Sequence, residues 1–100
     1  MTLPNTIRVL ALFKSKPEKC EALKNFLTKL IAPTRQEAGC LRYELHQNNA
    51  DPSDFVFIEE WESDATLDAH LQSPHVQAAL PLVGEYLTAS PDIRRYGQLK

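Results

Sequence analysis

The spacing of apolar residues changes along this chain from the period of a strand to that of a helix, most clearly within residues 55–76. Residues 55–61 are rich in aromatic and β-branched side chains, which is typical of a strand. From Leu67 onward the apolar residues recur at helical spacing. Ser63 lies between the two patterns as a candidate helix N-cap. We therefore expect a strand that ends at Trp61, followed by a helix that carries His70.

The first half of the chain predicts two strands around a helix. Residues 6–14 alternate but are apolar on both faces, as in a strand covered on two sides. Residues 15–18, Ser-Lys-Pro-Glu, are typical of a capping box with proline in the first turn. The helix that follows is expected to end near Ala32, because the next residue is a proline. Residues 34–37 predict a second capping box on a short turn that Gly39 ends.

The second half is interpreted in the same way. Pro81 predicts a kink or break in its last helical segment. The predicted elements are a strand at 40–47, a long turn at 48–54, the strand at 55–61, a helix from about Ala65, a helical segment that starts at Ser73–Pro74, and a strand at 93–99.

This order of elements, β-α-β-β-α-β, is that of an α+β ferredoxin-like sandwich, and 100 residues are enough for one domain. Right-handed crossovers place both helices on one face of the sheet. The other face would expose the second apolar side of the strands at 6–14 and 55–61, a patch too large for a soluble monomer. We therefore predict a homodimer that packs through the sheet faces.

Composition excludes several classes of function. The net charge of −2 and the absence of a basic cluster argue against nucleic acid as a partner. No apolar run approaches the roughly 20 residues of a membrane span, and residues 1–5 do not resemble the start of a secretion signal. We expect a cytoplasmic protein in which Cys20 and Cys40 are buried thiols, although a disulfide between them stays open.

Three stretches of sequence together resemble a known family. They are residues 39–45, Gly-Cys-Leu-Arg-Tyr-Glu-Leu; residues 59–63, Glu-Glu-Trp-Glu-Ser; and residues 69–75, Ala-His-Leu-Gln-Ser-Pro-His. The chain is similar to the antibiotic biosynthesis monooxygenase domain in its small stand-alone form, which includes quinol monooxygenases. The resemblance implies a dimeric α+β barrel with a pocket in each subunit, and oxidation of a quinol or phenol by molecular oxygen, in many members without a cofactor.

Within that framework His70 is the candidate catalytic base. An imidazole accepts a proton near neutral pH, and a quinol anion passes an electron to oxygen more readily than the neutral quinol. Either Glu59 or Glu60 is expected to orient this ring, depending on the register of the strand. Trp61 is either a core anchor or a flat wall for an aromatic substrate.

Further candidate contacts to a small aromatic or quinol-like substrate are Tyr43, Phe57, Phe13 and His46. Tyr43 is more typical of the core, and His46 either lines the pocket or faces water. No cofactor is expected, because the three glycines lie far apart and form no phosphate-binding loop. No metal site is predicted, because His46, His70 and His75 lack a recognised ligand spacing.

Three functions remain open from the sequence. The first is a cofactor-independent monooxygenase that acts on a small quinol or phenol. The second is an isomerase of a small carbonyl compound, which would use the same histidine and carboxylate without oxygen. The third is a dimeric ligand-binding or stress-associated domain without catalysis. Turnover with and without oxygen distinguishes these three functions.

Overall fold

The computed structural model describes residues 6–100 and contains four strands, with the helical segments between them. The sequence prediction about a secretion signal at residues 1–5 lies outside the described residues. The elements are β1 (Ile7–Lys14), η1 (Pro17–Lys19), α1 (Cys20–Thr28), α2 (Ile31–Arg35), β2 (Cys40–Asn48), β3 (Asp51–Trp61), α3 (Asp64–Leu71), α4 (Pro74–Val83), η2 (Gly84–Tyr86) and β4 (Asp92–Tyr96).

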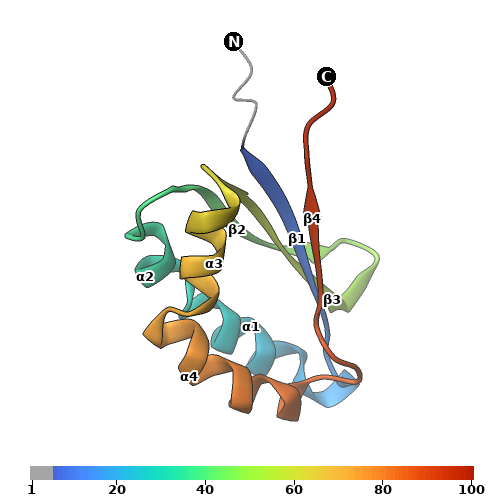
Figure 1. Cartoon of the computed structure of the whole chain (residues 1–100). Coiled ribbons are helices and arrows are strands. Elements are labelled where there is room, and N and C mark those ends of the chain that lie inside the picture. The colour runs from blue at the N-terminus through green and yellow to red at the C-terminus, as the bar shows by residue number, and fades with distance from the viewer. Residues whose placement is uncertain (1–5) are drawn as a thin grey trace.

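The four strands form one antiparallel sheet in the order β2-β3-β1-β4, and the helices gather on one side of it (Figure 1). The predicted ferredoxin-like α+β fold is therefore confirmed. The register of the sheet pairs Ala11 with Phe57 and Val9 with Glu59, so these side chains lie on the same face. This face meets the helices, since Val9, Ala11 and Phe57 are buried together with Leu23 and Leu27 of α1.

The opposite face of the sheet carries a second set of apolar side chains, as predicted. Leu10 pairs with Ile58 and Leu12 with Val56 across β1 and β3. All four side chains are half-buried in the single chain. Arg8 and Glu60 form an ion pair of 3.0 Å on this face. The face is thus an apolar strip beside charged residues, and none of the helices in the described part of the chain covers it.

Local signals located two helix starts correctly and two incorrectly. Ser63 and Ser73 are the N-caps of α3 and α4, and each side chain accepts a hydrogen bond from the backbone three residues later. The capping box predicted at residues 15–18 is wrong, because that segment forms the turn η1 with no side-chain cap. The box predicted at residues 34–37 is also wrong, because Thr34 lies inside α2 and is fully buried.

The prolines interrupt the helices less than predicted. Pro33 occupies the third position of α2, where its missing N–H costs no helical hydrogen bond. The break in the first helical region comes earlier, after Thr28. Pro81 lies within α4, which continues to Val83. The turn predicted at 48–54 is much shorter, because β3 already begins at Asp51, and the last strand ends at Tyr96 rather than at residue 99.

Both cysteines are free thiols, and each is partly exposed rather than fully buried. Cys20 lies 3.1 Å from the Ser15 hydroxyl, measured from Sγ to Oγ. No helix within residues 6–100 combines the length and the apolar character needed to cross a bilayer.

Candidate active site

His70 lies in the last turn of α3, on the side of that helix that packs against the sheet. The start of the helix is fixed by a reciprocal cap: the Ser63 hydroxyl accepts from the Thr66 N–H, and the Thr66 hydroxyl accepts from the Ser63 N–H. Counting from this cap, Leu67 and His70 are one turn apart and are the buried side chains of α3. His70 is 4% exposed.

The end of β3 places an acid and an indole beneath this histidine. Glu59 and Trp61 are two residues apart, so both point to the helix-covered face. The Trp61 indole N–H donates a hydrogen bond of 2.9 Å to the Glu59 carboxyl. The Trp61 ring lies 4.6 Å from the His70 ring between centroids, at an interplanar angle of 34°. Trp61 is completely buried, and the His70 ring packs against it.

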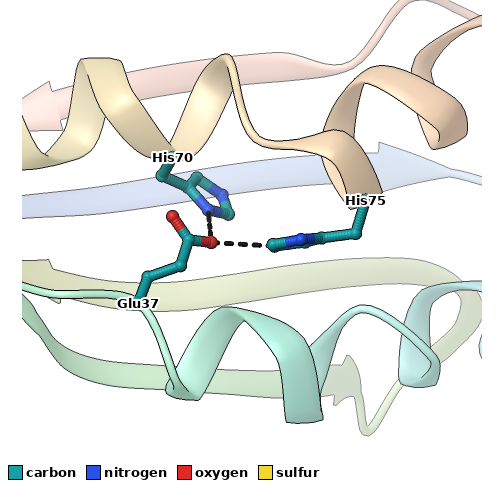
Figure 2. A group of neighbouring side chains, drawn as sticks. All are labelled: Glu37, His70 and His75. Carbon is teal, nitrogen blue, oxygen red and sulfur yellow. Dashed lines mark hydrogen bonds and ion pairs between the residues drawn. The ribbon is translucent and has the colours of Figure 1, made fainter.

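A third segment contributes Glu37, a residue of the capping box that the sequence pattern predicted at residues 34–37. One carboxylate oxygen of Glu37 lies 2.7 Å from Nδ1 of His70 and 2.8 Å from Nε2 of His75, so it bridges the two imidazoles (Figure 2). Glu37 follows α2, and His75 is in the first turn of α4. Gly39, at a φ of 84°, provides the left-handed residue that turns the chain from this segment into β2.

His70 and Glu59 also line a cavity between the sheet and the helices. Its volume is about 60 Å³, and its wall is almost entirely apolar. Leu80 and Ile93 line it and are 49% and 45% exposed, so they mark the side that opens to solvent. An apolar cavity of roughly 150 Å³ is known to admit benzene. An aromatic ring therefore requires this cavity to widen, and the exposed Leu80 side is where it can do so.

Three of the predicted substrate contacts line the same cavity: Tyr43, Phe57 and Phe13. Tyr43 stacks on Phe57 at 4.4 Å between ring centroids and meets the edge of His70 at 5.5 Å. Phe13 packs edge-on against Phe57 at 6.0 Å. The wall beside His70 is thus a cluster of aromatic rings.

Burial shifts the pKa values of Glu59 and His70 on the cavity wall in opposite directions. Burial raises the pKa of Glu59 to about 7, while the Trp61 hydrogen bond lowers it and the charge of Glu37 raises it. Burial lowers the pKa of His70, and the hydrogen bond that its Nδ1 donates to Glu37 partly opposes that change. At neutral pH His70 is therefore a neutral imidazole, and Glu59 exchanges between its acid and carboxylate forms.

The Glu37 carboxylate also selects the tautomer of His70. A carboxylate only accepts hydrogen bonds, so Nδ1 of a neutral His70 carries the ring proton and donates a hydrogen bond to Glu37. The lone pair of the ring is then on Nε2. A neutral imidazole with a fixed tautomer and an ionisable acid beside an apolar cavity is an arrangement suited to proton transfer.

Three candidates from the sequence lie away from the cavity wall. Glu60 points to the opposite face of the sheet and pairs with Arg8 at 3.0 Å. His46 is exposed and lies 3.0 Å from the Glu44 carboxylate on that face. Trp61 lies beneath His70 and is absent from the lining, so its position does not fit the predicted stacking on a substrate. The register of β3 therefore selects Glu59 over Glu60 as the acid at the cavity.

Fold and site together define an α+β domain with a small apolar chamber and a buried histidine–carboxylate pair. The sequence profile of the antibiotic biosynthesis monooxygenase family matches residues 6–82. The chain therefore belongs to the antibiotic biosynthesis monooxygenase family, as the resemblance predicted.

Individual relatives agree with this assignment. The Mycobacterium tuberculosis protein named "Putative monooxygenase Rv0793" is 40% identical over 88 residues, which cover 88% of this chain and 84% of that protein. The Escherichia coli protein named "Probable quinol monooxygenase YgiN" is 30% identical over 82 residues, covering 72% of this chain and 79% of that protein. A crystal structure of a conserved protein from Methanosarcina mazei superimposes with a TM-score of 0.90 at 33% identity, over 96% and 95% of the two chains.

Proposed function

We propose that this protein is a monooxygenase that oxidises a small quinol or phenol with molecular oxygen and without a cofactor. The observation that carries the proposal is the buried His70, which contacts Glu37 through one ring nitrogen and lines an apolar cavity. Membership of the antibiotic biosynthesis monooxygenase family supports the reaction class, and the name of the E. coli relative supports a quinol as the substrate.

In this proposal His70 removes the phenolic proton. Nε2 accepts the proton, and the Glu37 carboxylate stabilises the imidazolium that forms, at 2.7 Å from Nδ1. The quinol anion then reduces oxygen. One oxygen atom enters the ring to give a hydroxyquinone, and the other leaves as water, so the quinol supplies all four electrons.

The cavity supports this chemistry in two ways. Its apolar wall strengthens the interaction between the new phenolate and the imidazolium, because few water dipoles screen them. The aromatic cluster of Tyr43 and Phe57 offers a flat surface for the substrate ring. Glu59, with a pKa of about 7, is the second group able to take up or return a proton during turnover.

The test is oxygen consumption with menadiol, measured for the wild type and for His70→Gln. We expect a wild-type rate well above uncatalysed autoxidation, and a loss of about 10²- to 10⁴-fold in kcat for the variant, which is the usual contribution of a general base. His46→Gln is the matched control, because His46 also pairs with a glutamate but is exposed on the opposite face. A wild-type rate equal to autoxidation, or an equal loss in both variants, would contradict the proposal.

A second candidate, an acid–base isomerase of a small carbonyl compound, is favoured by the presence of both His70 and Glu59 on the wall of one cavity. Two ionisable groups whose pKa values are shifted in opposite directions can act as base and acid. Such an enzyme would turn over under argon. A reaction that stops completely without oxygen and resumes when oxygen returns excludes this candidate.

We further propose that the protein is a homodimer through the outer face of the sheet. The four half-buried apolar side chains of β1 and β3 form a strip that no helix or strand within residues 6–100 covers. Ile58→Asp would put a charge in the middle of that strip. We expect light scattering to show a dimer for the wild type and a monomer for the variant, and a monomeric wild type would refute this interface.

A further inference from the structure

We propose that Glu37, His70 and His75 form a binding site for one divalent transition metal ion, of which Zn²⁺ and Co²⁺ are the suitable representatives. The proposal concerns binding alone and does not require the proposed reaction, although the site shares Glu37 and His70 with it. Its three residues come from three segments, the loop after α2, the last turn of α3 and the first turn of α4, which the fold brings together (Figure 2).

The geometry of the donor atoms is close to that of a metal site. One ligand atom from each residue lies within 4.8 Å of the others, and the two carboxylate–imidazole distances are 2.7 and 2.8 Å. Ligand atoms around an ion at about 2.0 to 2.1 Å are separated by roughly 3 Å. An ion between the three therefore requires each side chain to move by a fraction of an ångström to an ångström.

The donor set indicates which ions fit. Two imidazole nitrogens and one carboxylate oxygen suit borderline metals such as zinc and cobalt, whereas magnesium and calcium prefer oxygen ligands alone. Three protein ligands leave at least one coordination position for water or another small ligand. The His70 side chain is almost fully buried and the other two are only slightly exposed, so the ion would be shielded on most sides.

The surroundings would also hold the ligands in place. The His70 ring packs against the Trp61 ring at 4.6 Å between centroids. The Ser73 hydroxyl caps α4 and donates to the His70 carbonyl at 2.6 Å, which ties the end of α3 to the start of α4. These contacts limit the motion of the His70 ring and of the backbone that carries His75, and a preorganised ligand set binds a metal more tightly than a flexible one.

The experiment uses the sole tryptophan of the chain as the reporter. Trp61 lies 4.6 Å from the His70 ring, so a paramagnetic ion at this site would quench its fluorescence. We would titrate the untagged full chain with CoCl₂ and then add ZnCl₂ in competition. We expect saturable quenching of the Trp61 fluorescence with one cobalt ion per chain. The fluorescence should recover when zinc displaces cobalt.

Two variants assign the site. His75→Ala removes one ligand at the cluster edge, and Glu37→Gln replaces the carboxylate by an amide that still accepts hydrogen bonds. Each is expected to weaken cobalt binding by at least about tenfold. His46→Ala, at an exposed histidine on the opposite face, should bind like the wild type. Circular dichroism checks that each variant is folded, and Glu37→Gln alone suffices if His75→Ala is not.

Two results would overturn the proposal. One is the absence of saturable quenching up to millimolar cobalt. The other is equal cobalt affinity in the wild type and the folded Glu37→Gln variant, which would place the ion elsewhere on the surface.

Discussion

Replacing Glu59 by glutamine tests the electrostatics of the cavity. Glu59 is 4% exposed, and its pKa is raised from 4.5 to about 7. In the unfolded chain the pKa returns to its ordinary value, so between about pH 4.5 and pH 7 the folded state binds the proton more tightly. Stability therefore falls as the pH rises through this window. A difference of roughly 2.5 pKa units corresponds to about 3 kcal/mol.

Glu59→Gln removes this titration and keeps an oxygen that accepts the Trp61 N–H. The buried amide itself changes the free energy of unfolding, but this contribution does not depend on pH. We therefore expect the free energy of unfolding of the variant, minus that of the wild type, to increase by about 3 kcal/mol from pH 4 to pH 8, so that the variant gains stability relative to the wild type.

The assay is urea unfolding at fixed protein concentration, at half-unit steps of pH, for both proteins. Glu60→Gln is the matched control, because Glu60 is the next residue but points to the opposite face and pairs with Arg8. If the difference between Glu59→Gln and wild type stays constant within 0.5 kcal/mol (on the order of experimental error) across this range, Glu59 titrates normally and the reasoning about its burial is wrong.

Three further predictions concern the neighbours of this site. Glu37→Gln should lower kcat for quinol oxidation about 10- to 100-fold with little change in KM, since the amide cannot stabilise imidazolium at His70; steady-state kinetics test this, and an unchanged kcat would refute it. Zinc should inhibit the same reaction, because an ion on Nδ1 keeps the ring proton on Nε2; activity that is indifferent to saturating zinc would contradict this. Gly39→Ala should destabilise the fold by at least ~1 kcal/mol, because the φ of Gly39 is 84° and an added Cβ would lie 2.4 Å from the Thr66 side chain. Gly84→Ala is the control and should be nearly neutral, because open space surrounds Gly84. Equal melting temperatures for the two variants would contradict this prediction.

The strands and helix starts of this fold were predictable because they depend on local pattern. The alternation in β1 and β3 places one set of apolar residues toward the helices, and the register confirms it. Ser63 and Ser73 each precede a helical pattern and form the caps they predict. The same reasoning failed at Ser15, whose hydroxyl lies against the Cys20 thiol instead. A serine has several local partners, and tertiary packing decides among them.

The candidate site was predictable only in part, because it joins residues far apart in the chain. His70 stood out through its helix and its apolar neighbours. Glu37 is 33 residues away from it, and its contact depends on how α2 and α3 meet. No local pattern reports that distance. The choice between Glu59 and Glu60 likewise needed the register of β3, because a shift by one residue exchanges the two faces.

The substrate-facing role of Trp61 illustrates a different limit. An aromatic residue at the end of a strand is equally compatible with a core anchor and with a pocket wall. The structure buries Trp61 beneath His70, and Tyr43 and Phe57 form the wall instead. Burial of a large side chain depends on the whole packing arrangement, which spacing along the chain does not contain.

The most direct test of the central claim is the fate of labelled oxygen. Menadiol would be turned over under heavy-isotope dioxygen by the wild type and by His70→Gln, and the products analysed by mass spectrometry. If the protein is a monooxygenase with His70 as its base, the product is a hydroxyquinone that carries one labelled oxygen atom. The wild type should form it rapidly, and the variant should form it at the background rate. An unlabelled product, or equal labelled product from both proteins, would contradict it.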